Sequence, residues 1–223
     1  MPEFLGDLVQ SFESAAEEAQ TMTFLARAVE LQERAVQVLE EFLARLAIEK
    51  KSRISAGDEE AANTVLSMEL ALQTVLHELK MWIDLKQERP ESAWDHLVTA
   101  QQLCLSAAHV RRQLVGKPST AGLENLYAKL ETVERVVFPP QIFMSVGGTA
   151  QTRECSICGA NYEDCGHVKG RAYLGKLCHA VIRAFSAEEV SLVEEPANKR
   201  CRVTHFSDGG KMRNRMTWRL ETR

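Results

Sequence analysis

Five side chains that commonly bind metal ions lie within 24 residues of the C-terminal part of the chain. They are Cys155, Cys158, Cys165, His167 and Cys178. Only one further cysteine, Cys104, precedes them, so they are not distributed as scattered buried thiols would be. A Cys-x-x-Cys-Gly turn lets two sulfurs face one ion, and Gly159 relieves the backbone strain of that turn. The spacing predicts a metal site that constrains how the surrounding residues fold.

Zinc is the ion that this ligand set favours, because thiolates and imidazoles suit a tetrahedral site. Five candidates for four positions leave one residue over. Our preferred set is Cys155, Cys158, His167 and Cys178, with Cys165 outside it. An iron–sulfur cluster is the alternative, since Cys-x-His is half of the Rieske ligand pattern, although Cys-x-x-Cys replaces the second half. Four protein ligands predict one structural zinc per chain.

The sequence predicts neither secretion nor membrane insertion. Residues 1–7 lack a basic region followed by an apolar run, and the apolar stretches are far shorter than the roughly 20 residues of a membrane span. Cysteines in ligand spacing, rather than in a disulfide framework, favour a reducing compartment. We therefore expect a cytoplasmic protein.

Residues 1–138 predict an antiparallel helical bundle, because long amphipathic helices are joined by short loops. The longest apolar stripe, with three- and four-residue steps, contains Phe24, Leu25, Ala28, Leu31, Ala35, Val38, Leu39, Phe42, Leu43 and Leu46. A weaker amphipathic piece with Leu5, Leu8, Val9 and Phe12 precedes it. Three more helices are expected at residues 58–87, from Pro90 onward, and from Ser119 or Thr120 to the Pro139-Pro140 pair.

The histidines of this part, His77, His96 and His109, are expected to be hydrogen-bonded or exposed side chains. The Glu-x-x-His pattern of a di-iron bundle is not found on the inward stripes.

Residues 139–223 predict a small zinc-stabilised α+β domain, which makes the whole chain α+β. Strands are expected at 141–146, ending at Gly147-Gly148, and at 189–193, 201–206 and 216–220, with a short helix at 178–185. A segment of this length is small for a core of its own, so a bound ion would help to hold it together.

Three motifs of this domain follow one another in a recognisable order. They are Ser145-Val-Gly-Gly, the cysteine cluster ending in Gly-Arg-Ala-Tyr-Leu-Gly-Lys-Leu-Cys178, and Glu189-Val-Ser-Leu-Val-Glu-Glu-Pro-Ala-Asn198. In this order they resemble the C-terminal part of tailed-phage prohead (head-maturation) proteases, some of which carry a cysteine-rich insert between two such strands. The resemblance covers about a quarter of the chain and leaves the N-terminal helical part unrecognised.

The resemblance implies a β-barrel serine peptidase with Ser145 at or near the nucleophile strand. Helices occupy the part of the chain where the family carries its catalytic histidine, and no histidine lies between residues 110 and 166. A serine without a positioned base is a poor nucleophile. We therefore expect a shared zinc-and-strand module rather than an active protease.

The net charge of −4 hides an asymmetry between the two halves. Residues 1–150 carry a net charge of −8, whereas residues 151–223 carry +4. A basic end could bind nucleic acid, could meet the acidic half of another copy, or could be a solvated tail. The nucleic-acid candidates are Arg200, Arg202, Arg213, Arg215 and Trp218.

Three functions follow from these patterns. The preferred one is a non-catalytic zinc-binding interaction or adaptor protein of bacterial or prophage origin, in phage assembly or antiviral defence. Its helical bundle would bind a protein partner or a second copy. The alternatives are a nucleic-acid-binding protein that uses the basic end, and a serine peptidase of the prohead-protease type.

Overall fold

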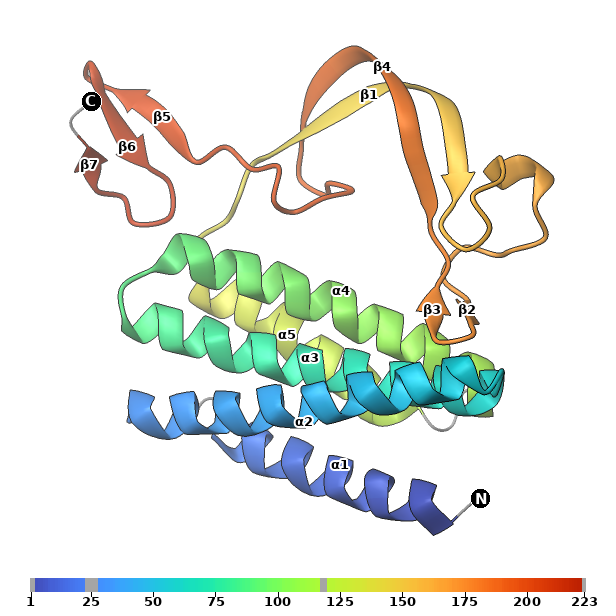
Figure 1. The fold of residues 1–223 in the computed structure, drawn as a ribbon. Helices are drawn as coiled ribbons and strands as arrows, with labels where there is room; N and C mark the ends of the chain where they lie inside the picture. The colour runs from blue at the N-terminus through green and yellow to red at the C-terminus, as the bar shows by residue number, and fades with distance from the viewer. Residues whose placement is uncertain (1–2, 23–27, 117–119, 222–223) are drawn as a thin grey trace. The chain divides into compact units, whose positions relative to one another are not determined.

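The computed structural model describes residues 3–22, 28–116 and 120–221 (Figure 1). The expectations for Phe24, Leu25 and Ser119, and for the side chain of Leu5, lie outside the described part. Internal contacts divide the chain into two compact units. The first comprises residues 1–130 together with 170–178, and the second comprises residues 131–169 and 179–223.

Five helices follow one another in the described residues, and their order confirms the predicted helical bundle followed by a small strand-containing region. They are α1 (Glu3–Thr21), α2 (Val29–Ser55), α3 (Glu59–Lys86), α4 (Pro90–Val115) and α5 (Ala121–Val137). Within the first unit, α3 runs between α2 and α4, and all three have long parallel axes (Figure 1). No helix in the described part is both long and apolar enough to cross a membrane.

The start of α3 is set by Asp58, whose side chain accepts a hydrogen bond from the backbone N–H of Ala61 at 3.1 Å. Pro90 occupies the first turn of α4, where its missing N–H costs no helical hydrogen bond. The core of the helices includes the fully buried Leu72 and Leu79 of α3 and Trp94 of α4. Burying a leucine side chain of this kind contributes about 1.5–3 kcal/mol.

A short hairpin also belongs to the first unit, although it lies beyond the predicted boundary at residue 138. It consists of β2 (Ala172–Tyr173) and β3 (Lys176–Leu177), which pair antiparallel. Ala172 is fully buried against Leu66 of α3 and Val110 of α4. The chain thus returns to the helices after residue 169.

The second unit is built around one long antiparallel ribbon. β1 (Phe143–Cys155) pairs with β4 (Ala180–Val193) from Phe143 opposite Val193 to Cys155 opposite Ala180 (Figure 1). A separate sheet has the order β5 (His205–Asp208), β6 (Lys211–Asn214) and β7 (Leu220–Glu221). Backbone hydrogen bonds from Met144 to Cys201 at 2.7 Å and from Val203 to Ile142 at 2.8 Å link the two parts.

Two expectations for this unit were wrong. Residues 180–185 belong to β4 rather than to a short helix, because pairing with β1 overrides their local preference. The predicted strand at 141–146 does not stop at the glycine pair but continues to Cys155. A Cβ on Gly148 would lie 2.1 Å from the backbone oxygen of Ser186, so glycine permits the close approach at a bulge.

The strands near the C-terminus are also shifted from their predicted positions. The predicted strand at 201–206 is realised as β5 with an isolated bridge between Phe143 and Arg202. The predicted strand at 216–220 is realised only as the two-residue β7, and β6 was not predicted.

Candidate metal centre

Four of the five predicted ligands lie together in the second unit. They are Cys155 at the end of β1, Cys158, Cys165 and His167. Their ligand atoms all lie within 4.8 Å of one another. In a tetrahedral site with metal–sulfur bonds of about 2.3 Å, two sulfurs are about 3.8 Å apart. The group therefore has the composition and the spacing to hold one metal ion.

A tight turn after β1 positions the first two thiols. The backbone N–H of Gly159 donates to the carbonyl of Cys155 at 2.8 Å, and the N–H of Cys155 donates to the carbonyl of Ala160 at 2.8 Å. Gly159 has a φ of 72°, which side chains rarely tolerate. The backbone N–H of Ile157 points at the Cys155 sulfur at 3.4 Å. The predicted Cys-x-x-Cys-Gly turn is thus present.

A second turn positions Cys165 and His167. The short helix η2 (Tyr162–Asp164) precedes them, and the thiol of Cys165 donates to the carbonyl of Tyr162 at 3.5 Å. The hydroxyl of Tyr162 accepts a hydrogen bond from the backbone N–H of Lys169 at 2.8 Å, which closes the loop around both ligands. Residues 161 and 154 form an isolated bridge that joins this loop to the end of β1.

Two thiols of the group, those of Cys155 and Cys165, have pKa values that are shifted in opposite directions. Burial raises the pKa of Cys155, but hydrogen bonds from the backbone N–H groups of Cys158 and Ile157 and from the thiols of Cys165 and Cys158 together lower that pKa to about 6. Burial raises the pKa of Cys165, and the neighbouring sulfurs of Cys155 and Cys158 raise it further. A pKa of about 6 favours the thiolate form of Cys155 at neutral pH, which is the form that binds a metal ion.

The group differs from our preferred ligand set at one position, because it contains Cys165 and not Cys178. Cys178 is fully buried at the base of the β2–β3 hairpin in the first unit. Its backbone donates to the carbonyl of Arg171 and accepts from Gly170, both at 2.9 Å. The chain bends at residues 165–166, so the alternate residues Cys165 and His167 reach the same point.

The five nucleic-acid candidates lie in the second unit, and several of them are engaged within it. Arg213 donates to Asp208 at 2.7 Å and to the carbonyl of Trp218 at 2.6 Å, and Arg215 donates to the carbonyl of Pro140 at 3.2 Å. Arg202 is 8% exposed, and burial lowers its pKa. Arg200 is exposed.

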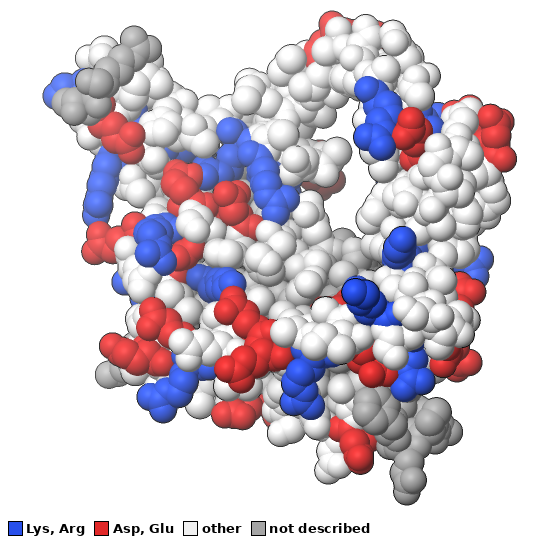
Figure 2. Space-filling view, viewed as in Figure 1, with Lys and Arg blue, Asp and Glu red and all other residues white. Residues whose placement is uncertain are grey.

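The aromatic candidate, Trp218, is 55% exposed and meets Phe206 edge-on at 5.9 Å between ring centres. On the face drawn in Figure 2, acidic and basic side chains are interspersed rather than gathered by sign. The basic residues thus do not form a uniform positive surface on that face.

Ser145 lies in β1 opposite Ser191 of β4. The resemblance to prohead proteases implied that this serine is at or near the nucleophile strand. Among the hydrogen bonds of the described residues, none joins its side chain to a histidine. His205 instead contacts Glu221 through Nε2 and Thr204 through Nδ1, both at 3.0 Å.

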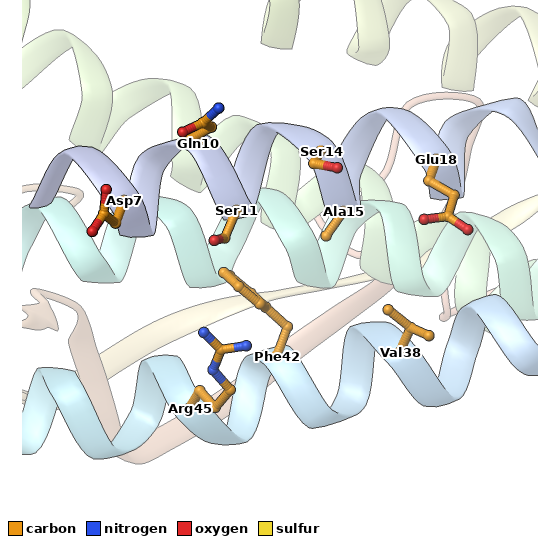
Figure 3. A pocket seen from close by; sticks show the side chains of 9 residues that line it. All are labelled: Asp7, Gln10, Ser11, Ser14, Ala15, Glu18, Val38, Phe42 and Arg45. Atoms are coloured by element: carbon orange, nitrogen blue, oxygen red, sulfur yellow. The ribbon is translucent and has the colours of Figure 1, made fainter. Parts of the chain in front are cut away.

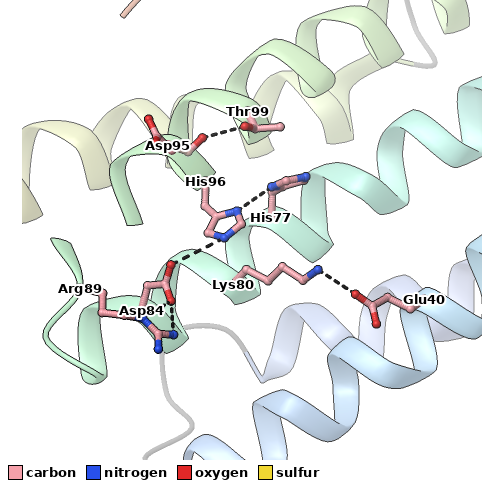
Figure 4. Close-up of polar contacts among 8 residues, drawn as sticks. All are labelled: Glu40, His77, Lys80, Asp84, Arg89, Asp95, His96 and Thr99. Carbon is pink, nitrogen blue, oxygen red and sulfur yellow. Dashed lines mark hydrogen bonds and ion pairs between the residues drawn. The ribbon is translucent and has the colours of Figure 1, made fainter. Parts of the chain in front are cut away.

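Two histidines of the helical bundle form a polar cluster at one end of α3 and α4 (Figure 4). The Nδ1 atoms of His77 and His96 lie 2.8 Å apart, and His96 Nε2 lies 3.6 Å from Asp84, which also pairs with Arg89. Burial lowers the pKa of His96, with Asp84 opposing the shift. The expectation that these two histidines are hydrogen-bonded is confirmed.

A groove of about 580 Å³ lies between α1 and α2 (Figure 3). Phe42 and Arg45 of α2 point across it towards Asp7 and Ser11 of α1, and the Arg45 guanidinium stacks 5.0 Å from the Phe42 ring centre. Serine, glutamine and acidic side chains line the α1 wall. The groove therefore lacks the apolar enclosure and convergent polar groups of a typical small-molecule site.

Comparison of the chain with protein-family models, with curated proteins and with solved structures finds no match. The metal-ligand group is accordingly the feature on which a function can be argued.

Proposed function

We propose that the chain is a zinc-binding interaction protein in which Cys155, Cys158, Cys165 and His167 hold one structural zinc ion. The observation that carries this proposal is the approach of three sulfurs and one imidazole to within 4.8 Å of one another. Three thiolates and one imidazole are a common closed ligand set for zinc. A Rieske cluster needs two histidines, and this group contains one.

A structural role follows from the number of ligands. Four protein ligands leave no coordination position for water, which a catalytic zinc requires. When bound, the ion would neutralise the thiolates, and its binding energy would contribute directly to the folding of residues 155–167. The two turns around Gly159 and Gly166 orient the ligands.

An interaction role is supported by the surface of the ribbon. Met144 lies opposite Leu192, and Val146 lies opposite Val190, so the four side chains share one face. Between 42% and 70% of each is exposed. Contiguous apolar surface of this kind is typical of protein–protein contacts. We also propose a bacterial or prophage origin, which the resemblance to prohead proteases suggests.

Metal analysis of the purified protein tests the zinc part of the proposal. We expect about one zinc per chain in the natural sequence, and loss of zinc in Cys158→Ser. Cys201→Ser is the matched control, because Cys201 is also exposed but lies outside the group. Iron with visible absorbance, or a full zinc content in Cys158→Ser, would overturn the proposal.

A photo-activated crosslinking amino acid tests the interaction part. Placed at Val190 in cells that express the protein, it should yield a discrete crosslinked species, because Val190 is 66% exposed on the apolar face. The control position is Val136 of α5, which is 77% exposed outside the ribbon. Equal crosslinking from both positions, or none from Val190, would contradict an interaction through this face.

A further inference from the structure

Two side-chain amides hold the β2–β3 hairpin by its backbone. Gln113 of α4 accepts from the N–H of Ala172 at 2.8 Å and donates to the carbonyl of the same residue at 2.9 Å. Asn63 of α3 accepts from the N–H of Gly175 at 2.8 Å and donates to the carbonyl of Ala172 at 3.4 Å. We call the hairpin residues 170–178 the latch, and the surface of α2, α3 and α4 that contacts it the seat.

The seat is also apolar and closely fitted. Ala172 is fully buried against Leu66 and Val110, and Leu177 packs against the same cluster. A Cβ on Gly175 would lie 3.1–3.3 Å from atoms of Ile54 and Lys50, so only glycine fits there without displacement. The latch is thus held by matched hydrogen bonds and by shape, although each of its strands has only two residues.

Both ends of the latch continue directly into the metal group. Only Val168 and Lys169 separate His167 from the first latch residue. On the other side, the residue after Cys178 is His179, whose N–H donates to the hydroxyl of Ser156 at 2.8 Å and whose carbonyl accepts from the N–H of Ser156 at 3.0 Å. Ser156 lies between the ligands Cys155 and Cys158.

Because of this connectivity, we infer that the latch stays bound to the seat only while the residues of the metal group are ordered. A two-stranded hairpin of this size is not stable by itself. It stays folded when its ends are held at the right separation, because the entropy of closing the loop has then already been lost. Zinc would fix residues 155–167, and its removal would free both ends.

We propose that residues 170–178 form a metal-dependent latch, which occupies its seat on the helices when the Cys3His group holds zinc and leaves it when zinc is removed. This inference rests on the proposed zinc binding. Release uncovers the apolar side chains Leu66 and Val110 together with the amides of Asn63 and Gln113. Metal occupancy is thereby converted into exposure of a surface on the helices.

Residue-resolved hydrogen exchange by NMR, on the full chain with and without a chelator, tests the latch. The N–H groups of Ala172 and Gly175 report the seat directly, because their acceptors are the Gln113 and Asn63 side chains. We expect both to exchange at least about tenfold faster after zinc removal. Amides in the middle of α3, from Leu72 to Leu79, should keep their exchange rates.

Two glutamine variants distinguish the loss of hydrogen bonds in the seat from the loss of the metal ion. In Gln113→Ala, zinc should remain bound while the Ala172 N–H exchanges as fast as in the chelated protein. Gln102→Ala on the exposed side of the same helix is the control and should match the natural sequence. Unchanged protection of Ala172 in Gln113→Ala would overturn the role of the seat.

The outcomes distinguish the two proposals. If the protein binds no zinc, the proposed function fails and the latch fails with it. If zinc binds, but its removal leaves the Ala172 and Gly175 amides protected, only the latch is refuted. Equal acceleration throughout α3 would also refute it, because it would show global unfolding rather than release of one hairpin.

Discussion

At the scale of single residues, individual cysteines, glycines and histidines determine the metal-ligand group, the fit of the latch and the pH dependence of the helical unit. Cys165 and His167 are alternate residues that reach one point only because the chain bends at residues 165–166, and spacing alone did not predict that bend. Cys155 and Cys158 could be predicted, because a Cys-x-x-Cys-Gly turn is fixed by local geometry. The place of Cys178 outside the group was not predicted, because it follows from the return of residues 170–178 to the helical unit, which the sequence does not reveal.

A glycine exchange tests the fit of the latch in its seat. Gly175→Ala should speed exchange of the Ala172 amide, because the new Cβ meets Ile54 and Lys50. Gly57→Ala is the matched control, since its φ of 70° is close to the 72° of Gly175 but no atom lies within 4 Å. Both variants carry a backbone strain of about 1 kcal/mol. Equal exchange of Ala172 in the two variants would argue against a close fit.

The histidine cluster predicts a pH dependence of the helical unit. Burial lowers the folded-state pKa of His96 below its unfolded value of about 6.5, so the unfolded chain binds more protons in that range. Stability should therefore fall as the pH falls below 6.5. In His96→Gln this part of the pH dependence should vanish, as measured by urea denaturation between pH 5 and pH 7. His109→Gln is the control, and a change of slope there but not in His96→Gln would contradict the account.

At the scale of elements, the helices could be predicted and the ribbon only in part. Apolar stripes and the caps at Asp58 and Pro90 are local signals, and α3 and α4 begin within a residue of the predicted positions. The ribbon depends on pairing between residues up to 50 apart in sequence, such as Phe143 with Val193. Local preference at residues 180–185 suggested a helix because that pairing is not visible in the sequence.

Two adjacent glycines allow a test of the ribbon. In Gly148→Ala the new Cβ would lie 2.1 Å from a backbone oxygen, so β1 and β4 must separate there, and amides around Ser186 should lose protection from exchange. In Gly147→Ala it meets only the flexible side chain of Glu189, at 2.8 Å, which can move. Similar exchange near Ser186 in both variants would mean that the bulge is not fixed by glycine.

At the scale of the whole molecule, the charge asymmetry leads us to expect only weak binding of nucleic acid. Arg213 and Arg215 already donate to groups within the second unit, and residues 1–150 carry a net charge of −8. We expect binding to a mixed-sequence duplex to be weaker than micromolar at physiological salt and to disappear steeply as salt rises. Fluorescence anisotropy measures it. Submicromolar binding that Arg213→Glu with Arg215→Glu abolishes would make nucleic acid the primary partner.

We propose that three sulfurs and one imidazole surround a single zinc ion in the second unit. X-ray absorption spectroscopy at the zinc edge can test this ligand set, because scattering distances identify the ligand atoms. We expect three sulfurs at about 2.3 Å and one nitrogen at about 2.0–2.1 Å, unchanged in Cys178→Ser. Four sulfurs, an oxygen ligand from water, or loss of a sulfur in Cys178→Ser would contradict it.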